Sequence, residues 1–331
     1  MSPNHPVARA WAWIGGMPMV LLVRGLFALA RALGPERSSD VGAFLTRTFG
    51  RLLKQNRIAT KNVRAAFPEK SDEEVRAIVR TAWSNLGRTA AEYPHLATIF
   101  DFDPENPGKG RIEIDPDSIA RFSELVGDGR GAVLFSAHLG NWELPAVCAA
   151  RFGLETTAIF RPPNDPATAR LVAEIRSGTM GGLAASTGAG AAYAVAGVLE
   201  KGGHLGQLID QHFSRGVVVD FMGRPALTNP LLAKLARHYE VPVHGARVIR
   251  LLGHRFRLEI TPALDLARDA EGQIDVKAAT QAMTKVVEGW VREYPEQWLW
   301  MHRRWRPAAD EAAAKEAAKA AAPTRGDPLA P

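Results

Sequence analysis

The sequence is 331 residues long, and its 46% hydrophobic and 23% charged residues exclude a generally disordered chain and allow a sizeable core. Its formal net charge of +6 suits an anionic partner, such as a phosphorylated lipid, a membrane surface, an acidic carrier protein or nucleic acid. The single cysteine, Cys148, excludes an intrachain disulfide and a multi-thiolate metal site, and its apolar neighbours favour a buried structural thiol.

The segment at residues 11–33 is apolar and about long enough to cross the hydrocarbon core of a bilayer. Pro18, Arg24 and Arg31 interrupt it, and a central arginine costs about 2.5–3.5 kcal/mol on insertion scales. The two arginines are seven residues apart and share one helix face, which indicates a helix lying in the membrane interface or a tilted span with that face against protein. We therefore expect residues 1–34 to be a retained membrane anchor, with a core helix of a soluble domain as the alternative.

A basic, helical region follows at about residues 40–96. Ser71 and Glu74 have the spacing of a capping box, which predicts that a helix begins there. The apolar positions after it follow the 3.6-residue period of an amphipathic helix. These positions are Val75, Ile78, Val79, Ala82 and Trp83.

From residue 111 to 306, strand and helix patterns alternate, which predicts an α/β fold with a mostly parallel, mixed sheet flanked by helices. Extended segments are expected at 131–136, 156–160, 204–209 and 217–221, with a hairpin at 241–251 and 254–260. Helices are expected at 142–152, 164–176, 191–200, 227–239 and 276–294. Residues 307–331 have no apolar stripe to bury, and we expect a solvated, disordered tail.

The first strand of this region leads into a candidate catalytic pair. On one continuous helix, His138 and Glu143 would point about 140° apart. Gly140 and Asn141 supply a turn and an N-cap between them, so the two side chains can converge at the carboxyl edge of the sheet, where α/β proteins bind ligands. A histidine with a carboxylate behind it can remove the proton of a hydroxyl that attacks a thioester. A loop histidine beside a helix-cap carboxylate is the alternative.

The segment His138–Glu143, with the sequence HLGNWE, resembles the H-x4-(D/E) motif of the glycerolipid acyltransferase superfamily. Its surroundings resemble, more specifically, the lipid A biosynthesis late acyltransferases, the lauroyl and myristoyl transferases of Gram-negative bacteria. The resemblance covers about residues 11–306. Its further blocks are Asn62–Pro68, Phe160–Pro162, Asp210–Gln211, Phe221–Gly223 with Thr228, and Glu296–Trp305.

This resemblance implies a glycerol-3-phosphate acyltransferase-like domain at residues 35–306, on a single N-terminal anchor at the cytoplasmic face of the cell inner membrane. It implies transfer of a fatty acyl chain from acyl carrier protein, or from coenzyme A, to a hydroxyl of a phosphorylated lipid A precursor, with no metal and no other cofactor. By the family roles, His138 is the general base and Glu143 orients it. The substrate-binding positions that the resemblance implies are Arg161, Asp210, Gln211, Gly223 and Thr228.

Several of these residues have a second interpretation. Arg161 offers a donor fork for a phosphate or an oxyanion, or it bonds loop carbonyls. Asp210 is part of the site, or it bonds neighbouring amides. Thr228 is read first as a helix N-cap before Pro230. The aromatic cluster at Trp298, Trp300 and Trp305 favours core packing with a basic rim over stacking on lipid headgroups.

Two other functions stay open. The acceptor is another glycolipid or a lysophospholipid, or the chain is a non-catalytic, membrane-associated scaffold. A serine hydrolase is disfavoured because the sequence has no G-x-S-x-G elbow, and a zinc enzyme because it has no H-E-x-x-H motif. Nucleic acid is not an expected partner, because the basic residues are spread along the chain without a binding motif.

Overall fold

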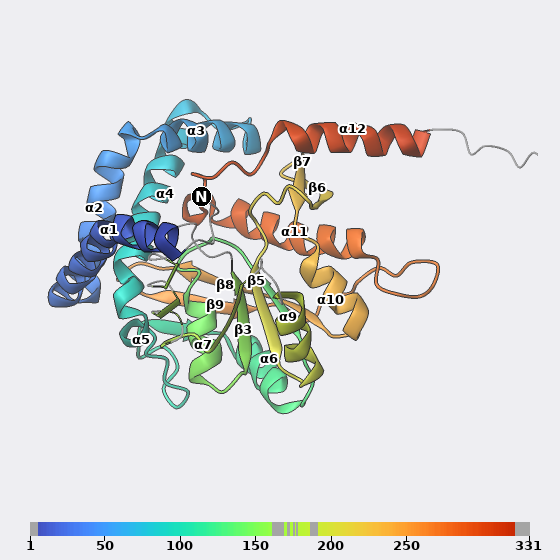
Figure 1. Ribbon diagram of the computed structural model, residues 1–331, viewed down its shortest axis with the longest axis horizontal. Coiled ribbons are helices and arrows are strands. Elements are labelled where there is room, and N and C mark those ends of the chain that lie inside the picture. Colours follow the sequence, from blue (N-terminus) through green and yellow to red (C-terminus); the bar gives the residue numbers. More distant parts are fainter. Residues whose placement is uncertain are drawn as a thin grey trace, which may run out of the picture.

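The computed structural model describes residues 6–160, 169–170, 173–174, 176, 178–185 and 191–321. In this part of the chain, a group of N-terminal helices leads into a sheet that has helices on both faces (Figure 1). Arg161, the predicted donor fork, lies outside the described residues.

The N-terminal helices pack mainly through α2 and α4. The capping box at Ser71 and Glu74 is confirmed, and all five predicted apolar positions of the helix that it opens are buried. Gly42 and Gly87 allow a close helix crossing, since a Cβ atom at Gly42 would lie 2.3 Å from the carbonyl oxygen of Gly87. The elements are α1 (Pro6–Leu33), α2 (Pro35–Phe49), η1 (Gly50–Leu52), α3 (Lys54–Ala66), α4 (Asp72–Glu92), η2 (Tyr93–His95) and α5 (Leu96–Ile99).

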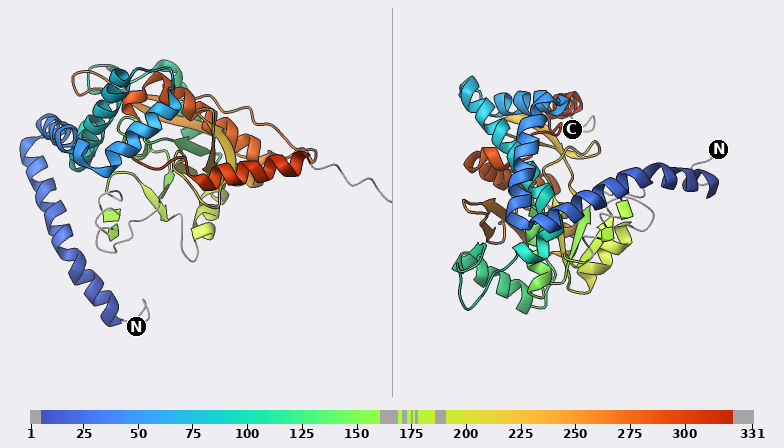
Figure 2. Two further views of the ribbon diagram at one scale, coloured as in Figure 1. Left: turned by 90° about the horizontal axis from the view of Figure 1, so that it is seen from above. Right: turned by 90° about the vertical axis from the view of Figure 1, so that its left-hand side faces the viewer.

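A helix is present where the sequence predicts an anchor, and α1 extends away from the rest of the molecule (Figure 2). Among the residues that the structure describes, no helix combines the length and the apolar character that crossing a bilayer requires.

The predicted mostly parallel sheet is confirmed. Within the described residues it has seven strands in the order β1-β9-β8-β2-β5-β3-β4. The strands β8, β2, β5, β3 and β4 run parallel, whereas β9 and β1 run the opposite way because β9 returns from β8 as the predicted hairpin. Their bounds are β1 (Ile112–Ile114), β2 (Val133–Ser136), β3 (Thr156–Phe160), β4 (Gly182–Ala185), β5 (His204–Leu208), β8 (Val243–Arg250) and β9 (Phe256–Ile260).

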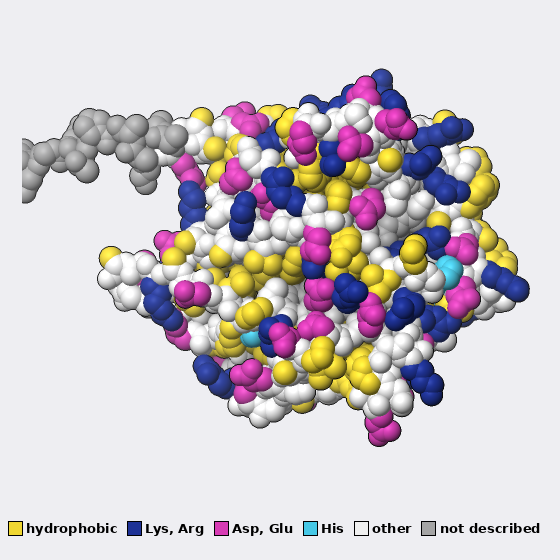
Figure 3. Space-filling model, turned by 180° about the vertical axis from the view of Figure 1, so that it is seen from behind, with side chains coloured by type: hydrophobic (Ala, Val, Ile, Leu, Met, Phe, Trp, Pro, Cys, Tyr) yellow, Lys and Arg dark blue, Asp and Glu magenta, His cyan; other side chains and the backbone are white. Residues whose placement is uncertain are grey.

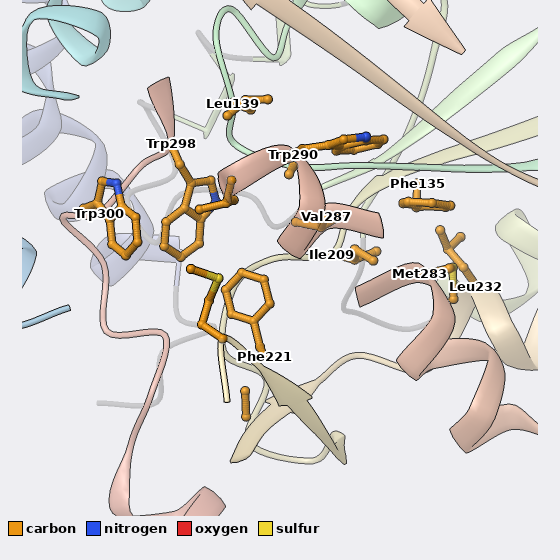
Figure 4. Packing of buried hydrophobic residues seen from close by; sticks show 14 of the residues in the cluster. Phe135, Leu139, Ile209, Phe221, Leu232, Met283, Val287, Trp290, Trp298 and Trp300 are labelled. Carbon is orange, nitrogen blue, oxygen red and sulfur yellow. The ribbon is translucent and has the colours of Figure 1, made fainter. Parts of the chain in front are cut away.

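Successive residues of β2 point to opposite faces of the sheet, and each face has its own helices. Phe135 stacks on Trp290 of α11 at 5.7 Å, within the larger core cluster (Figure 4). Leu134 packs on the other face with Ala149 of α7 and Leu125 of α6. The helices are α6 (Pro116–Gly127) and α7 (Leu144–Arg151) on this second face, and α9 (Ala191–Glu200), α10 (Leu231–Tyr239) and α11 (Val276–Glu293) on the first.

Two sequence predictions on the C-terminal side are wrong. Residues 224–228 belong to β7 (Arg224–Thr228), which pairs with β6 (Val217–Phe221), so the helix predicted from 227 begins only at Leu231. Local residue chemistry favoured a helix cap at Thr228, but cross-strand pairing decides the structure. Pro307–Ala321 form a helix, α12, that packs on β7 and buries Ala309, so this part of the predicted tail is ordered.

Candidate active site

The loop after β2 places the predicted catalytic histidine at the carboxyl edge of the sheet. Gly140 brings the loop close to β8. Its φ of +57° suits glycine, and a Cβ atom there would lie 2.2 Å from the carbonyl oxygen of Val248. On its other side, the carbonyl of His138 accepts a hydrogen bond from the amide of Leu299 at 3.0 Å. The loop is therefore clamped between β8 and the segment after η3 (Pro295–Gln297).

The carboxylate that holds His138 is Asp210. Nδ1 of His138 lies 2.7 Å from Oδ1 of Asp210, and the backbone amide of His138 donates to Oδ2 at 2.8 Å. Because an ionised carboxylate only accepts hydrogen bonds, Nδ1 carries the proton and Nε2 is left as the basic nitrogen. Nε2 lies 3.2 Å from the side-chain nitrogen of Gln211, on the exposed side of the ring. This geometry is that of a base and its orienting carboxylate.

Asp210 is buried, and three donors surround its carboxylate. The indole nitrogen of Trp298 donates to Oδ2 at 2.7 Å, in addition to the two groups of His138. Burial alone would raise the pKa of Asp210, but electrostatic attraction to the adjacent His138 and these hydrogen bonds hold that pKa well below its usual range. The aspartate is therefore ionised at neutral pH. Trp298 itself lies between Trp300 and Phe221 (Figure 4), which confirms the predicted core packing of this aromatic cluster.

Glu143 does not hold His138. Its Oε1 atom accepts from a guanidinium nitrogen of Arg176 at 2.7 Å and from the indole of Trp142 at 3.1 Å. The prediction that Glu143 orients His138 is corrected in this respect, because both ring nitrogens of the histidine have other partners, Asp210 and Gln211. Nothing in the spacing of the motif could identify Arg176, which lies on a different segment of the chain.

The other predicted binding residues have different positions. Gln211 is brought to His138, as described above. Thr228 is fully buried, and its hydroxyl accepts a hydrogen bond from Arg304, which also donates to the backbone carbonyls of Gln211 and Leu227. Gly223 has a φ of +71° and forms the two-residue turn between β6 and β7, which explains a glycine there without a ligand.

Arg304 is a further polar residue beside the site, and its position could not be predicted individually from the sequence. Its side chain is completely buried, and burial lowers its pKa to about 10, so it is still charged at neutral pH. It connects the segment after β5 with the end of β7, next to Asp210. The only signal in the sequence was its place in the block Glu296–Trp305.

A buried polar network supports the loop from the opposite side. Glu92 of α4 accepts from Arg250 at 2.8 Å and from the side-chain amide of Asn141 at 2.9 Å. Asn85 and Thr89 each donate to the carbonyl of Gly140 at 3.1 Å. Burial would raise the pKa of Glu92, but the adjacent Arg250 guanidinium lowers it overall. These contacts make α4 the support of the loop that carries His138.

An apolar cavity, here called the sheet–α7 cavity, lies beside the loop. It runs across one face of β3, β5, β2, β8 and β9, with α7 above it. Five neighbouring strands span roughly 19 Å, at about 4.8 Å per strand. Ser136, Trp142 and Glu143, which flank His138 in the chain, all line it, together with Arg176. Small residues such as Gly206 and Ala158 leave its floor open.

Within the described residues, no three His, Cys, Asp or Glu side chains are grouped to hold a metal ion. The site that the structure does show is a histidine–aspartate pair at a sheet edge, next to an apolar cavity. In general chemical terms, such an arrangement can accept a proton from a hydroxyl beside a long apolar group.

The comparisons identify the family. The family model of the bacterial lipid A biosynthesis acyltransferases matches residues 14–307. The chain is 26% identical to a lipid A biosynthesis myristoyltransferase of Escherichia coli (strain K12), over 91% of this chain and 88% of that protein. It is also 26% identical to the palmitoleoyltransferase of lipid A biosynthesis from the same organism, over 91% and 92%. The chain belongs to the bacterial lipid A biosynthesis acyltransferase family, and it is an O-acyltransferase.

Proposed function

We propose that the protein transfers a fatty acyl chain from a thioester donor, on acyl carrier protein or coenzyme A, to a hydroxyl of a phosphorylated lipid A precursor. The observation that carries this proposal is the His138–Asp210 pair at 2.7 Å, beside the sheet–α7 cavity. The family supports a lipid A acceptor, and the cavity supports a long acyl chain as the group that is moved.

In the proposed reaction, Nε2 of His138 removes the proton of the acceptor hydroxyl as its oxygen attacks the thioester carbonyl. The tetrahedral intermediate collapses with cleavage of the carbon–sulfur bond, and the imidazolium returns the proton to the leaving thiolate. Asp210 keeps the Nδ1–H tautomer and stabilises the imidazolium during these steps. Gln211, whose side chain lies 3.2 Å from Nε2, has to give way to the incoming hydroxyl. No enzyme nucleophile takes part.

The proposal also places the enzyme on a membrane surface, through exposed apolar faces of α1 and α2. Leu22, Leu26 and Leu29 of α1 share one helix face, and their exposed fractions are 57%, 54% and 57%. Arg24 lies on the opposite face and pairs with Glu174 at 3.6 Å. An apolar helix face of this kind, beside basic side chains, suits the interface of an anionic membrane.

The test is acyl transfer by the full-length chain from donors of both kinds to a lipid A precursor, with products identified by mass spectrometry. We expect His138→Ala and Asp210→Asn each to lower kcat by about 10²–10⁴, because one removes the base and the other its tautomer control. The double variant should be no worse than the more damaging single variant, because the two residues act as a unit.

Glu143→Gln supplies the matched control, because it removes a carboxylate of the same motif that contacts Arg176 instead. Its effect should be reproduced by Arg176→Gln and should not be coupled to His138. Circular dichroism should show unchanged folding for each variant. Full transfer by His138→Ala would contradict the proposal, and coupling of His138 to Glu143 rather than to Asp210 would contradict the assigned pair.

A further inference from the structure

The sheet–α7 cavity has a polar side and an apolar side. On the side of β3, Arg176 pairs with Glu143 and lies over the ring of Phe160 at 5.3 Å. On the side of β9, the lining consists of carbon and sulfur, from Leu258, Ile260 and other side chains. An acyl chain whose carbonyl lies at His138, after β2, therefore has its methyl end toward β9, where no polar side chain has to be desolvated.

A second cavity, here called the α6 cavity, begins where the first one ends. It lies between α6 and the segment around Phe102, and Ile114, Val126 and Phe152 line it. It is apolar like the sheet–α7 cavity. Four residues line both cavities and so form the partition between them. They are Phe122, Cys148, Leu258 and Ile260.

Two of these four residues belong to the framework of the fold. Leu258 and Ile260 are strand residues of β9, and the amide of Ile260 also donates a hydrogen bond to the hydroxyl oxygen of Ser118 at 2.9 Å. Phe122 and Cys148 come from the helices α6 and α7, and both line the two cavities. The ring of Phe122 rests edge-on against Phe152 at 6.2 Å. Burial raises the pKa of the Cys148 thiol to about 12, so the sulfur is an uncharged wall atom at neutral pH.

We propose that Phe122, together with Cys148, ends the acyl-binding cavity and sets the longest acyl chain that the enzyme accepts. This inference rests on the proposed acyl transfer and adds to it the determinant of chain length. Truncating Phe122 joins the sheet–α7 cavity to the α6 cavity and gives the methyl end of a longer chain an apolar space to enter.

The experiment compares the full-length wild type with Phe122→Ala, using lauroyl, myristoyl, palmitoyl and stearoyl thioesters and a lipid A precursor as acceptor. Discrimination by one methylene in an apolar pocket is worth roughly 10–200-fold in kcat/KM. We therefore expect the ratio of kcat/KM for the longer over the shorter donors to rise at least about tenfold in Phe122→Ala.

Phe102→Ala is the matched control. Phe102 also packs edge-on against Phe152, at 5.9 Å, and it lines the α6 cavity without lining the sheet–α7 cavity. The two variants thus remove the same side chain from the same aromatic cluster, but only one opens the partition. We expect Phe102→Ala to keep the wild-type donor profile. If Phe122→Ala does not fold, Phe122→Leu shortens the wall more mildly and should shift the profile in the same direction.

Failure of the proposed function and failure of the chain-length inference give different results. If the wild type transfers no acyl chain from any donor, the proposed function fails. If the wild type transfers an acyl chain but the Phe122 variants keep its donor profile, or shift it no more than Phe102→Ala does, the partition does not set chain length and the inference is overturned.

Discussion

At the level of single residues, Asp210 is the carboxylate to which polar groups of the site are hydrogen-bonded. Its two oxygens accept from His138 and Trp298, and the buried imidazole of His302 lies close enough to influence its ionisation. A single ionised carboxylate in a buried position is stable only because these donors satisfy it. Burial raises the pKa of a carboxyl group but lowers the pKa of an imidazole, so it favours the neutral form of His302.

His302 gives the protein a pH-dependent stability. Burial lowers its pKa to about 4, although the charge of Asp210 acts against this, while its unfolded value is near 6.5. Above pH 6.5 both states hold a neutral ring, but between about pH 6.5 and 4 only the unfolded state binds the proton, so the folded state loses stability as the pH falls. We expect this residue to account for a loss of roughly 3 kcal/mol over that window, at 1.36 kcal/mol per pKa unit.

The measurement is chemical denaturation at several pH values. His302→Asn should flatten the pH dependence between 6.5 and 4, since it keeps a side-chain donor near the carbonyl of Leu299, which Nδ1 of His302 contacts. His238→Asn removes an exposed histidine from α10 and serves as the control. An equal slope in His302→Asn and the wild type would contradict the assignment.

The histidine of the site could be predicted from the sequence, but its partner could not. Glu143 was the nearest carboxylate along the chain, whereas Asp210 reaches His138 only because β5 pairs directly beside β2. That pairing follows from strand order, which local patterns do not specify. Arg176 was missed for the same reason, since only the fold brings it to Glu143.

At the level of elements, the loop that carries His138 is held by α4 and β8 through the pair of Glu92 and Arg250. The pair is buried, with side-chain exposed fractions of 2% and 11%. Glu92 also accepts from Asn141 of the loop, and Arg250 also donates to Asn85, which in turn donates to the carbonyl of Gly140. Removing one member therefore disturbs the loop as well as the two elements.

Arg250→Met should lower the free energy of unfolding by about 3–5 kcal/mol, because Glu92 is then a buried charge without its partner. The double variant Arg250→Met with Glu92→Leu should recover part of this loss, because no unpaired charge is left. Arg255→Met is the control, since the Arg255–Glu113 pair is far more exposed, and its loss should cost about 0–1 kcal/mol. Urea denaturation measures all three, and equal losses for Arg250→Met and Arg255→Met would contradict the proposed support.

Elements with strong local signals could be predicted, and those that depend on distant pairing could not. The capping box and the apolar period fixed the start and the buried face of α4. The hairpin of β6 and β7 was missed because its second strand holds a proline and ends in a sequence typical of a helix cap. The helix α12 is mostly alanine and has no large apolar side chain, and its contact with β7 depends on that hairpin.

At the level of the whole molecule, the exposed apolar residues gather on the N-terminal helices. In addition to the leucines of α1, α2 has exposed large hydrophobic residues, which include Phe44 and Phe49 with exposed fractions of 54% and 56%. Hydrophobic side chains appear among basic ones at the edge of the molecule where α2 lies (Figure 3). Phe27 of α1 stacks on Tyr93 at 6.1 Å, and α1 therefore has one face against the protein while its leucines point away.

If these helices bind a membrane surface, the combined substitution of Leu22, Leu26 and Leu29 by Ser should release the protein from membranes. A fully buried leucine contributes about 1.5–3 kcal/mol, and these side chains are about half exposed, so we expect partition to anionic vesicles to fall at least tenfold. Phe44→Ser with Phe49→Ser tests the α2 face in the same assay. Leu252→Ser is the control, because Leu252 is 94% exposed in the loop between β8 and β9.

Vesicle sedimentation at low and high salt separates the two contributions to binding. Basic side chains beside the apolar faces should make binding weaker at high salt, whereas the leucine effect should persist at both. Acyl transfer to a soluble acceptor should survive the leucine substitutions, because α1 contributes no residue to the His138–Asp210 pair. Vesicle binding that is unchanged in both the α1 and the α2 variants would show that a different surface meets the membrane.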